Sequence, residues 1–90
     1  MATEILSIAA SAANSTDQVV AAGSTLTVGL KGTGGARVAD NAVVRVFLKD
    51  DSGNYNEVYV LTGYHPSTVL PQGTYRFQRA AGVSCGVYSG

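Results

Sequence analysis

The side chains best suited to chemistry in this sequence are a single histidine and a single cysteine, His65 and Cys85. A general base needs a partner that positions it, but His65 precedes Pro66 and has no serine or carboxylate motif attached. A nucleophilic cysteine needs an activating base, and nothing in the sequence brings His65 to Cys85. We interpret His65 as an ordinary loop residue and Cys85 as a small apolar core residue.

The densest group of oxygen ligands is formed by Asp50, Asp51, Asn54 and Glu57. Calcium requires several oxygens that converge on one point, and the DDSGN sequence can imitate such a loop. The spacing differs from that of an EF-hand, in which glycine is sixth and glutamate twelfth. A plain hairpin turn with Gly53 at positive φ is therefore favoured over a calcium site.

Residues 32–35 (GTGG) form a glycine-rich loop of the kind that can bind phosphate. A phosphate-binding loop needs a Lys-Ser/Thr pair and a following helix, and this segment has neither. We interpret it as a flexible connection. Since no other cluster of reactive side chains occurs, the sequence predicts no catalytic, cofactor-binding or metal-binding residues and a protein that is not an enzyme.

The tyrosines are the most suggestive group for binding. Tyrosine is favoured in strands and is also enriched at protein interfaces. Tyr59 and Tyr88 fall opposite the main apolar face of their strands, where they form either a second core layer or contact anchors. Tyr75 is expected in the core. The full set is Tyr55, Tyr59, Tyr64, Tyr75 and Tyr88.

Composition favours association with other protein chains. A chain of 90 residues forms one domain and buries only roughly 60–65% of its unfolded surface, so its core is thin. Cys85 has no disulfide mate, which leaves partner subunits as the source of added stability. Only 13% of the residues are charged while 46% are hydrophobic. Six basic and six acidic residues balance without a basic run, which argues against nucleic-acid binding.

Short runs of period-two alternation predict an all-β fold, a compact antiparallel sandwich or partly closed barrel of six to seven short strands. We expect the sandwich domain in residues 24–90, preceded by an N-terminal arm or edge segment in residues 1–23. Within that segment, a capping box at residues 15–18 could open a short helix, but a loop with an extended piece is favoured. The expected core contains the apolar residues of the strand faces: Leu26, Val28, Leu30, Val44, Val46, Leu48, Val58, Val60, Tyr75, Phe77, Cys85 and Val87.

The N-terminal segment is a poor match to a signal peptide because it has no basic residues, and no run approaches the roughly 20 apolar residues of a membrane helix. Synthesis in the cytoplasm and no membrane partner are therefore expected. Residues 3–13 are apolar and have no assigned partner, so we expect them to add a strand to a neighbouring subunit of a homo-oligomer or to extend over it as an arm, with a trimer as the expected form.

Two segments carry a resemblance to a known family. Residues 70–90 (LPQGTYRFQRAAGVSCGVYSG) resemble the C-terminal end of small virion proteins of tailed bacteriophages, in which a GTYR strand, a turn and a final GV strand close a β-sandwich. Residues 44–61 (VRVFLKDDSGNYNEVYVL) are similar to the central hairpin of these proteins. The similarity extends over roughly residues 24–90.

The resemblance implies a structural protein of the virion that decorates the capsid as an oligomer bound to the lattice of the major capsid protein. It carries over no functional residues, because the family has no catalytic set. Two alternatives remain: a head-fibre or tail component of the phage, and a carbohydrate-binding or adhesin module. The absence of tryptophan and of a signal peptide weighs against the carbohydrate-binding module.

Overall fold

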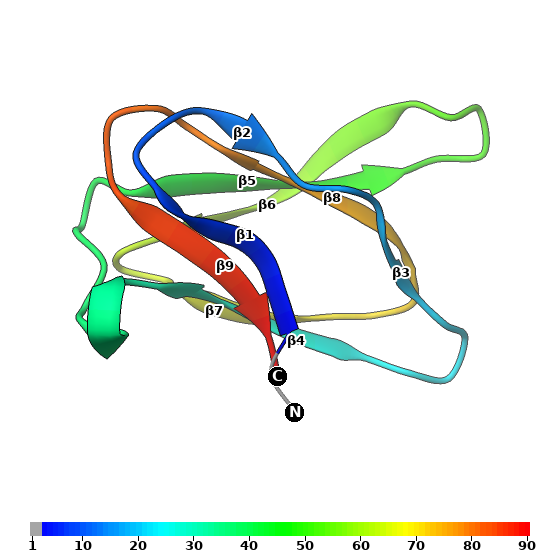
Figure 1. The fold of residues 1–90 in the computed structure, drawn as a ribbon. Helices are drawn as coiled ribbons and strands as arrows, with labels where there is room; N and C mark the ends of the chain where they lie inside the picture. Colours follow the sequence, from blue (N-terminus) through cyan, green and yellow to red (C-terminus); the bar gives the residue numbers. More distant parts are fainter. Residues whose placement is uncertain (1–2) are drawn as a thin grey trace.

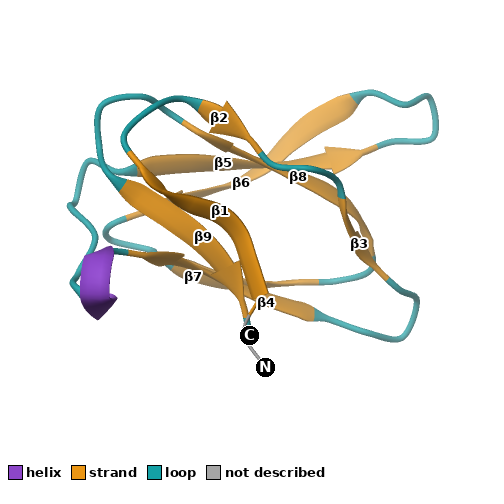
Figure 2. Ribbon diagram, in the orientation of Figure 1, coloured by secondary structure: helices purple, strands orange, loops and turns teal. Residues whose placement is uncertain are grey.

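The structure is a computed structural model that describes residues 3–90 and consists almost entirely of strands and loops (Figures 1 and 2). No helix in this part of the chain is long and apolar enough to cross a membrane. In chain order the elements are β1 (Thr3–Ala9), β2 (Ala13–Asn14), β3 (Gln18–Val20), β4 (Leu26–Lys31), the 3₁₀ turn η1 (Thr33–Gly35), β5 (Val43–Lys49), β6 (Tyr55–Thr62), β7 (Ser67–Leu70), β8 (Gly73–Arg79) and β9 (Cys85–Ser89).

The strands form two antiparallel sheets that pack face to face, which confirms the all-β sandwich. Sheet A has the order β1-β9-β4-β7, and sheet B has the order β2-β8-β5-β6 with β3 also paired to β8. The chain changes sheet at every connection except the β2–β3 link and the β5–β6 hairpin. This connectivity is that of a jelly roll, in which two Greek keys wind around one core.

The first 23 residues supply the outermost strand of each sheet. β1 pairs with β9 at the margin of sheet A, and its Leu6 is buried in the common core. β2 and β3 pair with β8 at the margin of sheet B, and Val20 is buried there. These strands are additional to the six or seven expected. β1 is hydrogen-bonded to β9 of its own chain, so residues 3–9 form an edge strand, and the extension of residues 3–13 onto a neighbouring subunit stays a prediction.

β2 and β3 are two halves of one interrupted edge strand. Between them, the Ser15 N–H donates to the Phe77 carbonyl (2.8 Å), and the Phe77 N–H donates to Ser15 Oγ (2.9 Å). The hydroxyl that a capping box would use to begin a helix is thus bonded to β8 instead. Residues 15–23 accordingly contain the short extended piece that the sequence favours, in the form of β3.

Most of the predicted core is confirmed. Val28, Leu30, Val44, Val46, Tyr75, Phe77, Cys85 and Val87 are buried. Leu26 and Leu48 are only partly buried but pack against this cluster. Leu70 is also buried, and the Tyr75 hydroxyl at the start of β8 donates to the Pro71 carbonyl (2.9 Å), which fastens the β7–β8 corner.

The prediction was wrong for the inward face of β6. Val58 is 49% exposed and Val60 is partly buried, whereas Leu61 is fully buried. Leu61 lies opposite Val44, and the register between β5 and β6 shifts after the pair Val46–Tyr59. Both faces of β6 are apolar in sequence, so alternation could not choose between them. The pairing with β5, including this bulge, decides which side chains enter the core.

A buried arginine joins the two sheets. Arg79, the last residue of β8, is 3% exposed. Its Nε donates to the Ser11 carbonyl (2.7 Å), and its Nη1 donates to the carbonyls of Ser7 (2.6 Å) and Cys85 (2.9 Å). No carboxylate pairs with it in residues 3–90. Backbone carbonyls of β1, the β1–β2 loop and β9 therefore compensate the buried charge.

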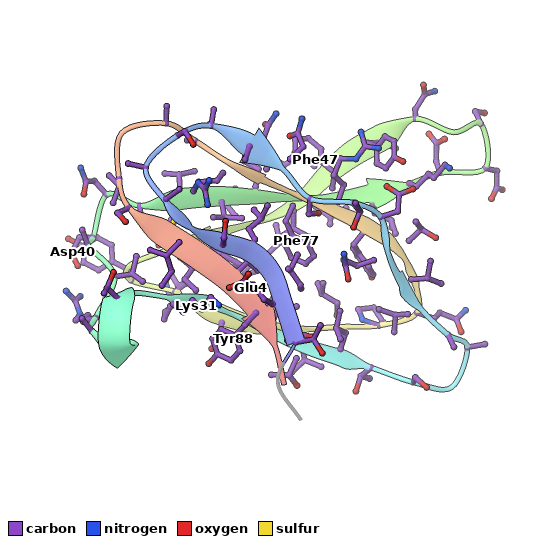
Figure 3. The ribbon with its side chains drawn as sticks, viewed as in Figure 1. Glu4, Lys31, Asp40, Phe47, Phe77 and Tyr88 are labelled. Atoms are coloured by element: carbon purple, nitrogen blue, oxygen red, sulfur yellow. The ribbon has the colours of Figure 1, made fainter. Side chains whose placement is uncertain are left out.

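Replacing Phe77 with alanine should lower the free energy of unfolding by about 3–5 kcal/mol, because the ring fills the space between the sheets and its loss leaves a cavity. Phe47, on the outer face of sheet B, is the matched control (Figure 3). Since Phe47 is only partly buried, Phe47→Ala should cost about 1–2 kcal/mol. Urea denaturation of both variants measures the difference, and equal losses would show that the described core is wrong.

Arg79→Ala should cost about 3–5 kcal/mol, because it leaves buried carbonyls without donors and a void at the sheet junction. Arg76→Ala on the same strand serves as a control: its side chain is 37% exposed, so its loss should not exceed about 1–2 kcal/mol. Denaturant unfolding followed by circular dichroism measures both values. An Arg79→Ala protein as stable as Arg76→Ala would contradict the joining role.

Candidate functional site

The structure does not bring His65 and Cys85 together. His65 lies exposed in the β6–β7 turn, where its carbonyl accepts the Thr62 N–H (3.2 Å). Cys85 is fully buried on β9 in the middle of sheet A. Burial raises the pKa of the Cys85 thiol, although the nearby Arg79 charge opposes that shift. A buried thiol with a raised pKa is a poor nucleophile, in line with its interpretation as a core residue.

The DDSGN segment is a hairpin loop closed by its own first residue. Asp50 Oδ1 accepts the N–H groups of Ser52 and Asn54 (both 2.9 Å), and Gly53 has φ +87°. Hydrogen bonds, chiefly from the Asn56 side chain, lower the pKa of Asp50. Glu57 pairs with Arg45 across the sheet instead (3.2 Å). Within residues 3–90, no three His, Cys, Asp or Glu side chains are grouped so as to hold a metal ion.

A polar cluster on the outer face of sheet B ties the β5–β6 hairpin to the loop before β3. The Tyr55 hydroxyl donates to Asp17 (2.9 Å), and this hydrogen bond is the main cause of a raised Tyr55 pKa. Arg76 Cζ lies 3.9 Å from the centre of the Tyr55 ring, and Arg76 Nη2 lies 3.3 Å from Asp17. Arg76 Nη2 also donates to the Tyr55 hydroxyl (3.0 Å), whereas Arg76 Nε is buried and has no hydrogen-bond partner within residues 3–90. We interpret the cluster as structural.

The first candidate surface is the free edge of sheet B, formed by β6. It is eight residues long, contains no proline, lysine or arginine, and pairs only with β5. β6 itself has one register shift, after the pair Val46–Tyr59. The other three edge strands are shorter than β6, and each has features that limit pairing with another chain. β1 has two irregularities in its register, β2 and β3 are short and interrupted, and β7 has four residues between Pro66 and Pro71. A long free edge offers backbone donors and acceptors to another strand.

Exposed apolar side chains accompany this edge. β7, the free edge of sheet A, follows β6 after a short turn, and β4 beside it contacts β6. We call this flank of the sandwich the β6–β7 side. Its exposed apolar residues are Val58, Tyr59, Tyr64 and Val69. Tyr64 (70% exposed) lies in the turn, and Tyr59 (38% exposed) lies on the edge strand.

The second candidate surface is a groove of about 640 Å³ on the outer face of sheet A. Three buried residues lie opposite one another in the register of sheet A and point into the core: Leu6, Leu30 and Val87. The residues next to them along each strand therefore point outward. Those outward neighbours include Lys31 and Tyr88, and the register shift between Glu4 and Leu6 places Glu4 opposite Tyr88 (Figure 3). The η1 turn forms one wall. The groove is lined by Thr3, Glu4, Ile8, Leu30, Lys31, Gly32, Gly34, Gly35, Ala36 and Tyr88.

Glycines of the two strands leave room for the groove and its tyrosine. A Cβ on Gly86 would lie 2.8 Å from the Leu6 carbonyl oxygen and 3.0 Å from Lys31 Cε. A Cβ on Gly29 would lie 3.2–3.3 Å from three atoms of the Tyr88 phenol, so that ring lies across β4. Lys31 Nζ and Glu4 Oε2 meet at 2.6 Å and join β4 to β1 across β9.

Sequence reasoning identified part of these surfaces. It selected Tyr59 and Tyr88 as contact candidates, and both are partly exposed. It missed Glu4 and Lys31, which are 27 positions apart in the chain and have no shared pattern. The alternation along β4 and the glycine at position 29 are the only local signals for an outward-facing groove.

No protein-family model, curated protein or solved structure matches this chain. Function is therefore inferred from the surfaces of the molecule and from the resemblance of its two β segments.

The buried Cys85 thiol predicts a loss of stability at alkaline pH. Its pKa is raised in the folded state, so the unfolded chain releases its proton first, near the ordinary value of 9.0. The contribution of the Cys85 thiol to the free energy of unfolding is therefore full below that pH. It is lost as the pH rises toward the pKa of the folded state. The stability of the natural protein should therefore fall relative to that of Cys85→Ala above pH 9. Urea unfolding from pH 7 to 10 tests this, and a constant difference would contradict it.

Proposed function

We propose that this protein is a non-enzymatic structural component of a bacteriophage virion that decorates the outer capsid surface as an oligomer and stabilises the capsid lattice. The observation that carries the proposal is the long free β6 edge beside the exposed apolar residues of the β6–β7 side. Proline and lysine on an edge strand oppose pairing with another chain. β6 contains neither, and its eight residues make it the longest of the edge strands.

The edge provides the kind of contact that a lattice protein needs. Backbone hydrogen bonds along β6 give an ordered register, while Val58, Tyr59 and Tyr64 bury apolar area around it. Tyrosine supplies large contact area at low entropic cost. We assign the contact between copies to this edge, in place of the residues 3–13 that the sequence suggested.

The choice of a phage capsid among protein partners rests on the resemblance of residues 44–61 and 70–90 to small virion proteins. The jelly roll is a fold that viral capsid proteins share with lectins and cupins, so it is compatible with the proposal without selecting it. Stabilisation needs no chemistry. A protein that binds the assembled lattice more tightly than loosened subunits shifts the equilibrium toward the lattice by that difference in affinity.

Val58→Lys should abolish the oligomer and lower occupancy on phage particles, because a lysine on an edge strand opposes pairing with another strand. Val58 is 49% exposed, so folding should be unaffected. Val19→Lys is the matched control, since Val19 is 74% exposed on the opposite edge strand β3. Sedimentation of both variants gives the oligomeric state, including whether it is a trimer or a dimer, and particle binding gives occupancy.

Particles stripped of the protein should lose their contents at a lower temperature, and adding back the natural protein but not Val58→Lys should restore them. The capsid role is wrong if stripped particles are equally robust or if the protein maps to a fibre or the tail. The edge assignment is wrong if the two lysine variants behave alike.

A further inference from the structure

We propose that the groove on the outer face of sheet A is a binding site for a neutral saccharide. One pyranose ring lies on the Tyr88 ring, and its hydroxyls bond to Glu4 and Lys31. This goes beyond the proposed function, because the groove is on the face of the opposite sheet and shares no residue with the β6–β7 side. A particle-bound protein would thus retain an outward site for sugar polymers.

The Tyr88 ring is placed as a platform rather than as a core residue. It is 38% exposed, and its Cε1, Cζ and hydroxyl lie at nearly equal distances from the Cβ position of Gly29. One face of the ring therefore covers the strand while the other is open. Such a surface is apolar in its middle and polar at its hydroxyl end, which matches the C–H face and hydroxyl rim of a pyranose.

The polar groups beside the ring favour a ligand without charge. Lys31 and Glu4 neutralise each other at 2.6 Å, and nearby Arg37 is paired with Asp40 (2.6 Å). A phosphate or carboxylate ligand would need an unpaired cation, which the lining residues do not offer. A neutral hydroxyl needs only a donor or an acceptor, and a charged partner makes that hydrogen bond stronger.

Both members of the ion pair have unused hydrogen-bonding capacity. Glu4 Oε1 makes no hydrogen bond within residues 3–90, and the Lys31 ammonium, with three donors, uses one on Glu4 Oε2. Adjacent hydroxyls of one sugar ring can therefore bond to both side chains at once. The Gly34 and Gly35 backbone in the wall, at positive φ, adds polar groups that no side chain covers.

The size of the groove is also suitable for one or two sugar residues. At about 640 Å³ it falls within the range of roughly 300–1,000 Å³ that small-molecule sites occupy. It is open along the sheet, so it can accept one or two residues of a longer chain rather than enclose a small molecule. Affinity per site should accordingly be modest, with a dissociation constant on the order of 1 mM.

The test is a titration of the ¹⁵N-labelled protein with neutral tetrasaccharides of glucose, galactose and N-acetylglucosamine, followed by amide chemical shifts. At least one should give saturable shifts at Gly86, Gly35 and Tyr88. Tyr88→Ala should weaken binding at least about tenfold, whereas Tyr88→Phe, which retains the ring, should bind nearly normally. Val19→Ala removes an exposed apolar side chain on β3, outside both candidate surfaces, and should leave saccharide binding unchanged.

Glu4→Gln provides a second test, in which binding of a charged saccharide should increase. It leaves the Lys31 charge without its partner, so a sulfated form of the bound tetrasaccharide should bind better than it does to the natural protein. The proposal is overturned if no neutral saccharide shifts the groove amides at tens of millimolar, if shifts map elsewhere, or if Tyr88→Ala binds unchanged. Preferential binding of a peptide probe there would likewise overturn it. None of these outcomes bears on the β6 edge.

Discussion

The structure depends on how the two sheets are held together where the jelly roll closes, and Arg79 does this. A charge is costly to bury unless it is well paired, yet Arg79 is almost fully buried and its partners are three main-chain carbonyls. Those carbonyls belong to β1, the β1–β2 loop and β9, while Arg79 belongs to β8. One guanidinium therefore fixes strands of both sheets, and only its planar set of donors can reach them together.

This fastening explains how a small chain can leave other parts of its surface open. The core is made of small and medium side chains around Phe77, and no disulfide supports it, since Cys85 is the only cysteine. With the sheet junction fixed, β6 can remain a free edge and the outer face of sheet A can contain a groove. The groove shares no lining residue with the β6–β7 side, so a contact through one surface does not use the residues of the other.

The glycines on sheet A show how the absence of a side chain creates a surface. Gly29 and Gly86 lie on neighbouring strands, and a Cβ at either position would meet atoms at close range. Their role is to let the Tyr88 ring and the Lys31–Glu4 pair lie flat across the sheet. In the sequence Gly29 interrupts an otherwise regular strand pattern, which is a local sign of a close approach.

The sequence by itself determined the fold class, the strands β4, β5, β6, β8 and β9, most of the core and the hairpin turn at residues 50–54, because alternation and turn chemistry act over a few residues. It did not determine β7, whose four residues lie between two prolines. It could not determine the inward face of β6, the role of the first 23 residues or the destination of the Arg79 side chain. Tertiary structure decided these: a bulge against β5 selects Leu61, and carbonyls about 70 positions away along the chain hold Arg79. The same holds for both candidate surfaces, since the pairing of Glu4 with Lys31 and the exposure of β6 depend on strand order. Strand order arises from contacts between distant segments, which no local pattern encodes.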